Sequence, residues 1–251
     1  MEAFVQSQVD VHGIATLTFF HPASNSLPAS LLAELAQHID EAGKDDIVKV
    51  IVLKSAGNRA FCAGASFDEL MAIETPEEGL SFFNGFALVI NAIRTCPKFV
   101  VGRVQGKAVG GGVGLAASVD HCLATKHASV KLSELAVGIG PFVVGPAVER
   151  KIGASGMGTL AIDATSWKTA TWAAEQGLYA EVFDDAEALD AAVEALARQL
   201  AQSNPEAMAH LKRVLWEGTE HWGQLLSERA AISGKLVLSD FTRKAIAAFK
   251  R

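Results

Sequence analysis

The sequence predicts an α/β protein with a helical C-terminal region, and three observations support this. Apolar segments of strand length alternate with amphipathic helical segments as far as about Asp184. Glycine- and alanine-rich loops connect these segments, as in a layered α/β core. Beyond Asp184 only helical patterns follow. The chain has 251 residues, half of them apolar and 7% aromatic, so it can bury one substantial core.

The first part of the chain supplies two strands, a helix and a third strand. Residues 4–11 and 14–20 are apolar or alternating, which predicts a β-hairpin. A helix is expected after Pro28 and ends at Gly43. The next apolar run, at 48–53, predicts a buried strand. The apolar face of the helix consists of Leu31, Leu32, Leu35 and Ile39.

A second helix is predicted from a capping signal. Thr75 and Glu78 have the spacing of a capping box, and Pro76 stands at the first helical position. We expect this helix to extend to about Arg94. The strand predicted at 99–104 then leads into a glycine-rich turn and another apolar helix.

The C-terminal region has three helical patterns, at 186–202, 205–216 and 225–249, with no strand between them. Their apolar residues exceed what three small helices bury among themselves. We therefore expect this region to pack on another subunit.

The composition argues against several classes of partner. The formal net charge is −6 and the acidic residues are scattered, so nucleic acid is not an expected partner. Cys62, Cys96 and Cys122 lack CxxC spacing, so neither a disulfide framework nor a metal site is predicted. The N-terminus lacks a signal-peptide pattern, and no stretch approaches the roughly 20 apolar residues that span a bilayer. We expect a cytoplasmic enzyme with no membrane partner.

Three glycines, Gly110 to Gly112, stand between a predicted strand and an apolar helix. Backbone N–H groups at a helix start have no partner within the helix and lie at the positive end of its dipole. Glycine lets a carbonyl oxygen approach them closely, so the turn is a candidate oxyanion site. Tight packing and phosphate binding are the alternatives, although neither a GxxxxGK[ST] nor a complete GxGxxG pattern fits.

A loop of small residues at 61–66 follows a buried strand and is the second candidate element. One N–H from this loop and one from the glycine turn would form a two-donor oxyanion hole, worth on the order of several kcal/mol to a thioester enolate. Taken alone, the loop is explained equally well as an ordinary turn.

Glu134 is the third element, because it is a single carboxylate among apolar and small residues. Loss of hydration raises the pKa of such a group, which can then exchange protons with carbon near neutral pH. The alternative is a solvated loop residue or a helix cap.

Three segments in order and spacing resemble the signature blocks of the enoyl-CoA hydratase/isomerase (crotonase) superfamily: residues 61–65, residues 106–112 with Asp120, and residues 132–141. Residues 21–25 and 173–178 also resemble family segments, so the resemblance covers nearly the whole chain. It implies a crotonase-like spiral of ββα units with a C-terminal helical trimerisation region, assembled as a homotrimer or a dimer of trimers. On this basis we assign residues 1–190 to the core with the CoA-thioester site and 191–251 to the oligomerisation region.

The resemblance also implies an acyl-CoA thioester substrate, in which coenzyme A is part of the substrate and no separate cofactor is needed. Ala63 and Gly111 fall where the family has its two oxyanion-hole donors. The adenine end of CoA is expected at the loop formed by Gly64, Ala65, Ser66 and Phe67. The same substrate site is expected to include Gly110, Gly114, Pro141 and Phe142.

The sequence departs from the pattern of the family's hydratases, which resemble one another in using two glutamates. The second corresponds to Glu134, but the first position is Gly114. Phe142 follows Pro141 where hydratases have a glycine that helps to hold water, and this stretch is more similar to isomerases. Moving a double bond requires only one shuttle base. The leading hypothesis is therefore an enoyl-CoA isomerase in which Glu134 takes a proton from the α-carbon and returns it at the γ-carbon.

Two other functions stay open. A specialised hydratase or dehydratase, for example on a methylglutaconyl-like CoA ester, would need a second acid. The candidates for this acid are Asp68, Glu69, Glu217 and Glu220. A non-catalytic CoA-ester or RNA-binding relative is the other alternative. An RNA binder should present a basic helix face, whereas Lys44 is the only Lys or Arg in the predicted helix at 31–44.

Overall fold

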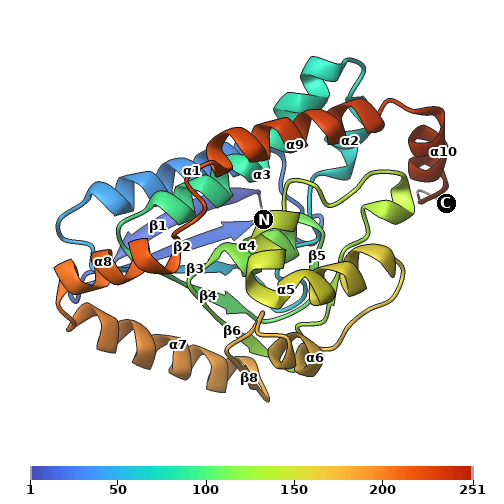
Figure 1. Cartoon of the computed structure of the whole chain (residues 1–251). Coiled ribbons are helices and arrows are strands. Elements are labelled where there is room, and N and C mark those ends of the chain that lie inside the picture. The colour runs from blue at the N-terminus through green and yellow to red at the C-terminus, as the bar shows by residue number, and fades with distance from the viewer. Residues whose placement is uncertain (1, 250–251) are drawn as a thin grey trace.

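A six-stranded sheet forms the centre of the molecule (Figure 1). The computed structural model describes residues 2–249. The strand order is β1-β2-β3-β4-β6-β8, with β1 antiparallel to β2 and the other neighbours parallel. The strand bounds are β1 Phe4–Val9, β2 Ile14–Phe20, β3 Val50–Ser55, β4 Phe99–Val104, β6 His121–Thr125 and β8 Glu181–Phe183.

A second, shorter ladder is formed by segments that follow the main strands. In it, β5 (Ala108–Val109) pairs with β7 (Val130–Lys131). Each turn of the chain thus contributes a main strand, a short segment of this ladder and then a helix, so the predicted ββα spiral is confirmed. Isolated bridges extend the ladder between Leu27 and Ala65, Cys62 and Ala108, and Val130 and Lys168.

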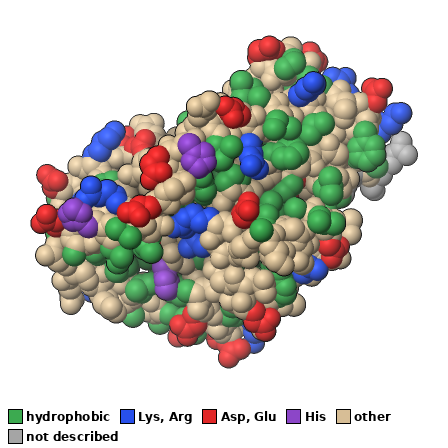
Figure 2. Space-filling model, in the orientation of Figure 1, with side chains coloured by type: hydrophobic (Ala, Val, Ile, Leu, Met, Phe, Trp, Pro, Cys, Tyr) green, Lys and Arg blue, Asp and Glu red, His purple; other side chains and the backbone are tan. Residues whose placement is uncertain are grey.

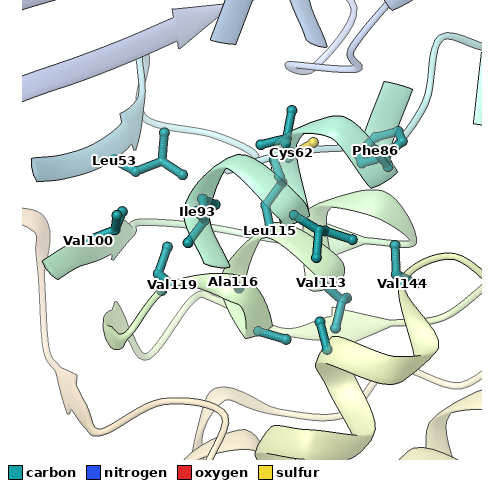
Figure 3. Packing of buried hydrophobic residues seen from close by; sticks show 14 of the residues in the cluster. Leu53, Cys62, Phe86, Ile93, Val100, Val113, Leu115, Ala116, Val119 and Val144 are labelled. Carbon is teal, nitrogen blue, oxygen red and sulfur yellow. The ribbon is translucent and has the colours of Figure 1, made fainter. Parts of the chain in front are cut away.

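Helices cover both faces of the main sheet, because successive strand residues point to opposite faces. In β3, Ile51 and Leu53 belong to the larger core, whereas Val50 and Val52 belong to the core under the helix on the opposite face. The larger core contains α1 (Ala29–Lys44), α3 (Pro76–Thr95) and α4 (Gly111–Ser118). Figure 3 shows side chains of α4 packed among those of β3, β4 and α3. The opposite face is covered by α7 (Ala186–Ala201).

The predicted capping signal of α3 is confirmed. The Thr75 side chain accepts a hydrogen bond from the Glu78 N–H at 3.2 Å, and the Glu78 carboxylate accepts one from the Thr75 N–H at 3.2 Å. Pro76 is the first residue of the helix, where its missing N–H costs nothing. Two shorter helices lie before and well after α3 in the chain, α2 (Phe67–Ala72) and α6 (Ala170–Glu175).

The C-terminal region differs from its prediction at one point. The single helix expected at 225–249 is two helices, α9 (Trp222–Leu236) and α10 (Asp240–Phe249), preceded by α8 (Pro205–Leu215). Ser239 Oγ accepts a hydrogen bond from the Thr242 N–H at 3.3 Å and so caps the start of α10. The apolar spacing continues through this break, and spacing alone therefore did not reveal it.

The apolar faces of two C-terminal helices pack within the chain. The long helix α9 lies along α3, where Gly79 and Gly234 touch so closely that a Cβ on Gly79 would be 2.6 Å from Gly234 Cα. Because α7 contacts the main sheet, the boundary assigned at residue 190 falls inside an element of the core. Among these C-terminal helices, α8 keeps a group of exposed apolar residues that another subunit could cover: Leu211, Val214 and Leu215.

A buried ion pair attaches α8 to the end of the main sheet. Lys212 Nζ lies 2.8 Å from Asp120 Oδ2, and the two side chains are 2% and 5% exposed. Asp120 also accepts hydrogen bonds from the Val100 N–H and from Trp216 Nε1, each at 2.8 Å. None of the helices within residues 2–249 has the length and apolar character required to cross a membrane.

Candidate active site

A cavity of about 190 Å³ lies between the loop after β3, the start of α4 and the segment around the short helix η1 (Leu135–Val137). Residues of α3 and α9 complete its walls. Figure 2 shows hydrophobic side chains gathered on the surface between α9 and the η1 loop. The predicted site residues that line the cavity are Ala63, Gly64, Ala65, Phe67, Gly110, Gly111, Glu134, Pro141 and Phe142.

The close contacts of the glycine turn disfavour side chains at its three positions. A Cβ on Gly111 would lie 2.2 Å from the ring of Phe86, and one on Gly112 would lie 2.4 Å from the Cys62 carbonyl oxygen. Gly110 has φ 53° and ψ −116°, a backbone conformation that residues other than glycine rarely adopt. As the first residue of α4, Gly111 has an N–H with no acceptor among the residues that the structure describes. This N–H is available to a ligand oxygen.

The second predicted donor, Ala63, is not free in this structure. Its N–H donates to the Ser24 carbonyl at 3.2 Å, near the long end of the normal range. Ser24 has φ 55°, and the turn that contains it is anchored by Asn25 Nδ2, which donates to the carbonyls of Ala56 and Ala60 at 3.0 Å. The Ala63 N–H can therefore reach a ligand only by sharing or exchanging its bond to Ser24. No local pattern in the sequence marks Ser24 as a site residue.

Glu134 has the environment expected of a proton-transfer group. Although the residue as a whole is half-buried, its Oε2 is fully buried and has no hydrogen-bond partner among the described residues. Its Oε1 lies 2.8 Å from the position that a Cβ on Gly110 would occupy, so the carboxyl group sits against the glycine turn. Loss of hydration raises the pKa of Glu134 to about 7.

The loop that carries Glu134 is held from both sides. The Glu134 carbonyl accepts a hydrogen bond from the Ile139 N–H at 2.9 Å, which closes the η1 turn. Gly138 adopts φ 83° at the end of η1, and its carbonyl accepts a hydrogen bond from Thr242 Oγ1 of α10 at 3.1 Å. The helix α10 therefore helps to hold the loop that carries Glu134.

Two predicted site residues do not line the cavity. Ser66 is 8% exposed and caps α2, since its Oγ accepts a hydrogen bond from the Glu69 N–H at 3.4 Å. Gly114 packs against Val144, which precedes α5 (Gly145–Ile162) and itself lines the cavity. A Cβ on Gly114 would lie 2.4 Å from Val144 Cγ1, so this position has no room for a side chain.

Sequence comparison assigns the chain to a family. The sequence model of the family described as enoyl-CoA hydratase/isomerase matches residues 10–249. The chain belongs to the enoyl-CoA hydratase/isomerase family. Enzymes of this family act on acyl-CoA thioesters, so the chain is an acyl-CoA enzyme, and the predicted family membership is confirmed.

Three relatives illustrate the range of this family. The chain is 29% identical to a "Probable enoyl-CoA hydratase" of Bacillus subtilis (strain 168), over 81% of this chain and 78% of that one. It is 28% identical to the 1,2-epoxyphenylacetyl-CoA isomerase of Escherichia coli (strain K12), over 86% and 82%. The solved structure of an enoyl-CoA hydratase from Mycobacterium avium is 26% identical, with a TM-score of 0.85 over 100% of this chain and 97% of that one. The crotonase-like fold is thereby confirmed.

The acids considered as replacements for the missing family glutamate lie outside the cavity. Glu69 Oε2 accepts a hydrogen bond from the Ala29 N–H at 2.8 Å, and Asp68 does not line the cavity. Glu217 and Glu220 line a separate groove, where the backbone N–H groups of Glu220 itself and of Gly218, together with Arg94, lower the pKa of Glu220. Within residues 2–249 no cluster of His, Cys, Asp and Glu could hold a metal ion.

Three cavity residues come from distant helices and were not predicted from the sequence. Phe83 and Phe86 come from α3, and Ser233 comes from α9. Both phenylalanines belong to the apolar spacing of α3, and this spacing contains no signal that part of the apolar face borders a cavity. Ser233 reaches the site only because α9 folds back along α3.

Proposed function

We propose that this protein is an enoyl-CoA isomerase that shifts a double bond through a thioester enolate, with Glu134 as its single acid and base. One observation carries the proposal. Among the described residues that line the cavity, Glu134 is the only one with an ionisable side chain. A reaction that needs one shuttle base fits this site better than one that needs two acids.

The reaction moves one proton from the α-carbon to the γ-carbon and leaves the atoms of the substrate otherwise unchanged. The Glu134 carboxylate removes a proton from the α-carbon of a 3-enoyl-CoA, and the electron pair of the broken C–H bond passes to the thioester oxygen. The protonated Glu134 then delivers the proton to the γ-carbon, and the enolate collapses to the conjugated 2-enoyl-CoA. A carboxyl with a pKa of about 7 is suited to both steps near neutral pH.

The enolate oxygen needs donors, and Gly111 is the first of them. Its N–H stands at the positive end of α4 without a protein acceptor among the described residues. We place the thioester oxygen between this N–H and that of Ala63, which would exchange its 3.2 Å bond to Ser24 for the charged acceptor. An enolate oxygen is a stronger acceptor than a backbone carbonyl, which favours this exchange.

The environment of Gly114 argues against ordinary water addition. Where hydratases have their first glutamate, this chain has no side chain, and Val144 fills the space. Phe142 and Val143 contribute further apolar surface to the cavity. A water molecule requires two to four polar partners, and these walls offer few.

The direct test is incubation of the purified protein with a 3-enoyl-CoA, with the conjugated product followed by absorbance and mass. We expect isomerisation by the wild type and a loss of roughly 10²- to 10⁴-fold in kcat/KM for Glu134→Gln, the usual contribution of a general acid–base. Glu187→Gln, an exposed change on α7, is the matched control and should retain full activity.

Rapid hydration of a 2-enoyl-CoA without isomerisation would instead support the hydratase or dehydratase alternative. A carboxylated substrate such as a methylglutaconyl ester is disfavoured, because no Lys, Arg or His among the described residues lines the cavity. Tight binding of thioesters without turnover of any of them would support a non-catalytic role.

A further inference from the structure

We infer that Ser233 selects substrates whose acyl chain carries a neutral oxygen group, a hydroxyl or a carbonyl, remote from the thioester; this rests on the proposed acyl-CoA function. Ser233 is a residue of α9 that lines the cavity and is 1% exposed. Among the described residues, no hydrogen-bond partner is present for its hydroxyl group.

An unpartnered serine is unusual at this position of the helix. The other buried positions on α9 are apolar or glycine: Trp222, Leu226, Ala230 and Gly234. A buried serine in a helix commonly donates to the carbonyl one turn earlier, as Ser118 does to Gly114 at 2.7 Å. Ser233 makes no such bond. Its hydroxyl therefore borders the cavity without a partner in the described protein, and a ligand can supply that partner.

The geometry of α3 places Ser233 away from the thioester. The ring of Phe86 borders Gly111 at the oxyanion turn, whereas Gly79 touches Gly234, the neighbour of Ser233. Phe86 stands seven positions after Gly79 on α3, which is about 10 Å along the helix axis. The wall between these points includes Phe83, whose apolar ring suits an acyl chain better than the amides of the CoA arm.

The chemistry of the cavity limits the group that Ser233 can recognise. A serine hydroxyl both donates and accepts, so it can pair with a hydroxyl or with a carbonyl. A carboxylate in this cavity would have no cation to compensate it, and an ammonium group would have no carboxylate other than the proposed base, Glu134. A neutral oxygen group is the class that remains.

The competing explanation is that Ser233 is required only for its small volume. The close approach of Gly79 to Gly234 shows that α3 and α9 tolerate little bulk at this crossing. Alanine would meet that requirement as well as serine does. The two explanations therefore differ in the effect of Ser233→Ala on ligand selectivity.

The experiment measures dissociation constants by calorimetry for saturated acyl-CoA thioesters, which contain no double bond to shift. In one series of constant chain length, a carbonyl replaces a methylene at successive positions from the γ-carbon outward. We expect the wild type to bind one of these compounds roughly two- to tenfold more tightly than the hydrocarbon parent, the gain of one neutral hydrogen bond. Ser233→Ala should lose this preference while keeping its affinity for the parent.

Two further variants complete the design. Ser227→Ala changes a serine of α9 that does not line the cavity, and it should keep the preference of the wild type. Ser233→Cys keeps a polar atom at the same position but is a weak donor and only slightly larger, so it replaces Ser233→Ala if thermal melting shows that the alanine variant is unfolded.

The outcomes separate this inference from the proposed function. Binding of the series without preference at any position, or a preference that survives Ser233→Ala, would overturn the role of Ser233 and leave the isomerase proposal standing. A preference that Ser233→Ala removes supports it even if 3-enoyl-CoA is not isomerised. Failure of every thioester to bind would overturn both.

Discussion

At the scale of single residues, the chemistry of Glu134 depends on what surrounds its carboxyl group. The Oε2 atom is fully buried and unpartnered among the described residues, and Oε1 lies against Gly110. No cation lines the described part of the cavity to stabilise the carboxylate. Desolvation therefore dominates, and it raises the pKa to about 7.

This shift predicts the pH dependence of the reaction. The group that removes the α-proton must be deprotonated, so kcat/KM should rise with pH and level off above the pKa of about 7. One pH unit below the pKa, activity should be roughly a tenth of the plateau. A pH-rate profile with 3-enoyl-CoA measures this directly. A midpoint near 4.5, the ordinary value for a glutamate, would show that desolvation does not act on the free enzyme.

At the scale of elements, the junction of α4 and α5 decides which residues the site can contain. Gly114 of α4 and Val144, which precedes α5, occupy one space, and Figure 3 shows Val144 beside α4. Replacing the glycine alone cannot restore the hydratase pattern, because both Cβ and Cγ1 of Val144 would lie within 2.6 Å of the new Cβ.

We expect Gly114→Glu to destabilise the protein by about 1–3 kcal/mol or more through overpacking. Gly114→Ala should show a large part of the same loss, because the clash begins at the Cβ. Combining Gly114→Glu with Val144→Gly removes the obstructing atoms and should recover stability and introduce hydration of a 2-enoyl-CoA. Thermal melting and a hydration assay measure the two effects. An unchanged melting temperature for Gly114→Ala would contradict the packing argument.

The attachment of α8 depends on the buried ion pair of Asp120 and Lys212. Removing one partner leaves the other charge buried and uncompensated. Asp120→Asn should therefore lower the free energy of unfolding by about 3–5 kcal/mol, measured by urea denaturation. Asp184→Asn is the control, since its pair with Lys126 is exposed and should contribute less than about 1 kcal/mol. Equal losses in the two variants would refute the importance of burial.

At the scale of the whole molecule, the face of α8 supports a proposal about assembly. Leu211, Val214 and Leu215 are 51%, 58% and 49% exposed and lie within one turn of each other. We propose that this face contacts another copy of the chain in a homotrimer or a dimer of trimers. An interface between copies would remove this apolar surface from water.

Light scattering should therefore report three or six chains in solution for the wild type. Leu211→Glu combined with Val214→Glu should reduce the assembly, because two buried charges would face the partner. Ile162→Glu, at an exposed apolar residue of α5, is the control. A monomeric wild type would remove the basis of this proposal, and an unchanged assembly in the double variant would place the interface elsewhere.

Local signals in the sequence predicted most elements correctly. The capping box of α3, the hairpin of β1 and β2 and the glycine turn before α4 all depend on residues close together in the chain. The break between α9 and α10 was not predicted, because the helix ends before Ser239 while the apolar spacing of the sequence continues. Helical spacing reports which face is buried, but it does not report where a helix turns.

Short-range patterns in the sequence determined the α/β class and most of its elements. The resemblance to the family, which rests on motifs along the chain, implied the ββα spiral and a site that contains Glu134 and Gly111, and both residues line the cavity. Only the tertiary structure decided that Val144 closes the space at Gly114, that Ser24 holds the N–H of Ala63, and that Ser233 borders the cavity. These contacts join segments distant in the chain. Their distances depend on how strands and helices pack together, and no local pattern of residues records that packing.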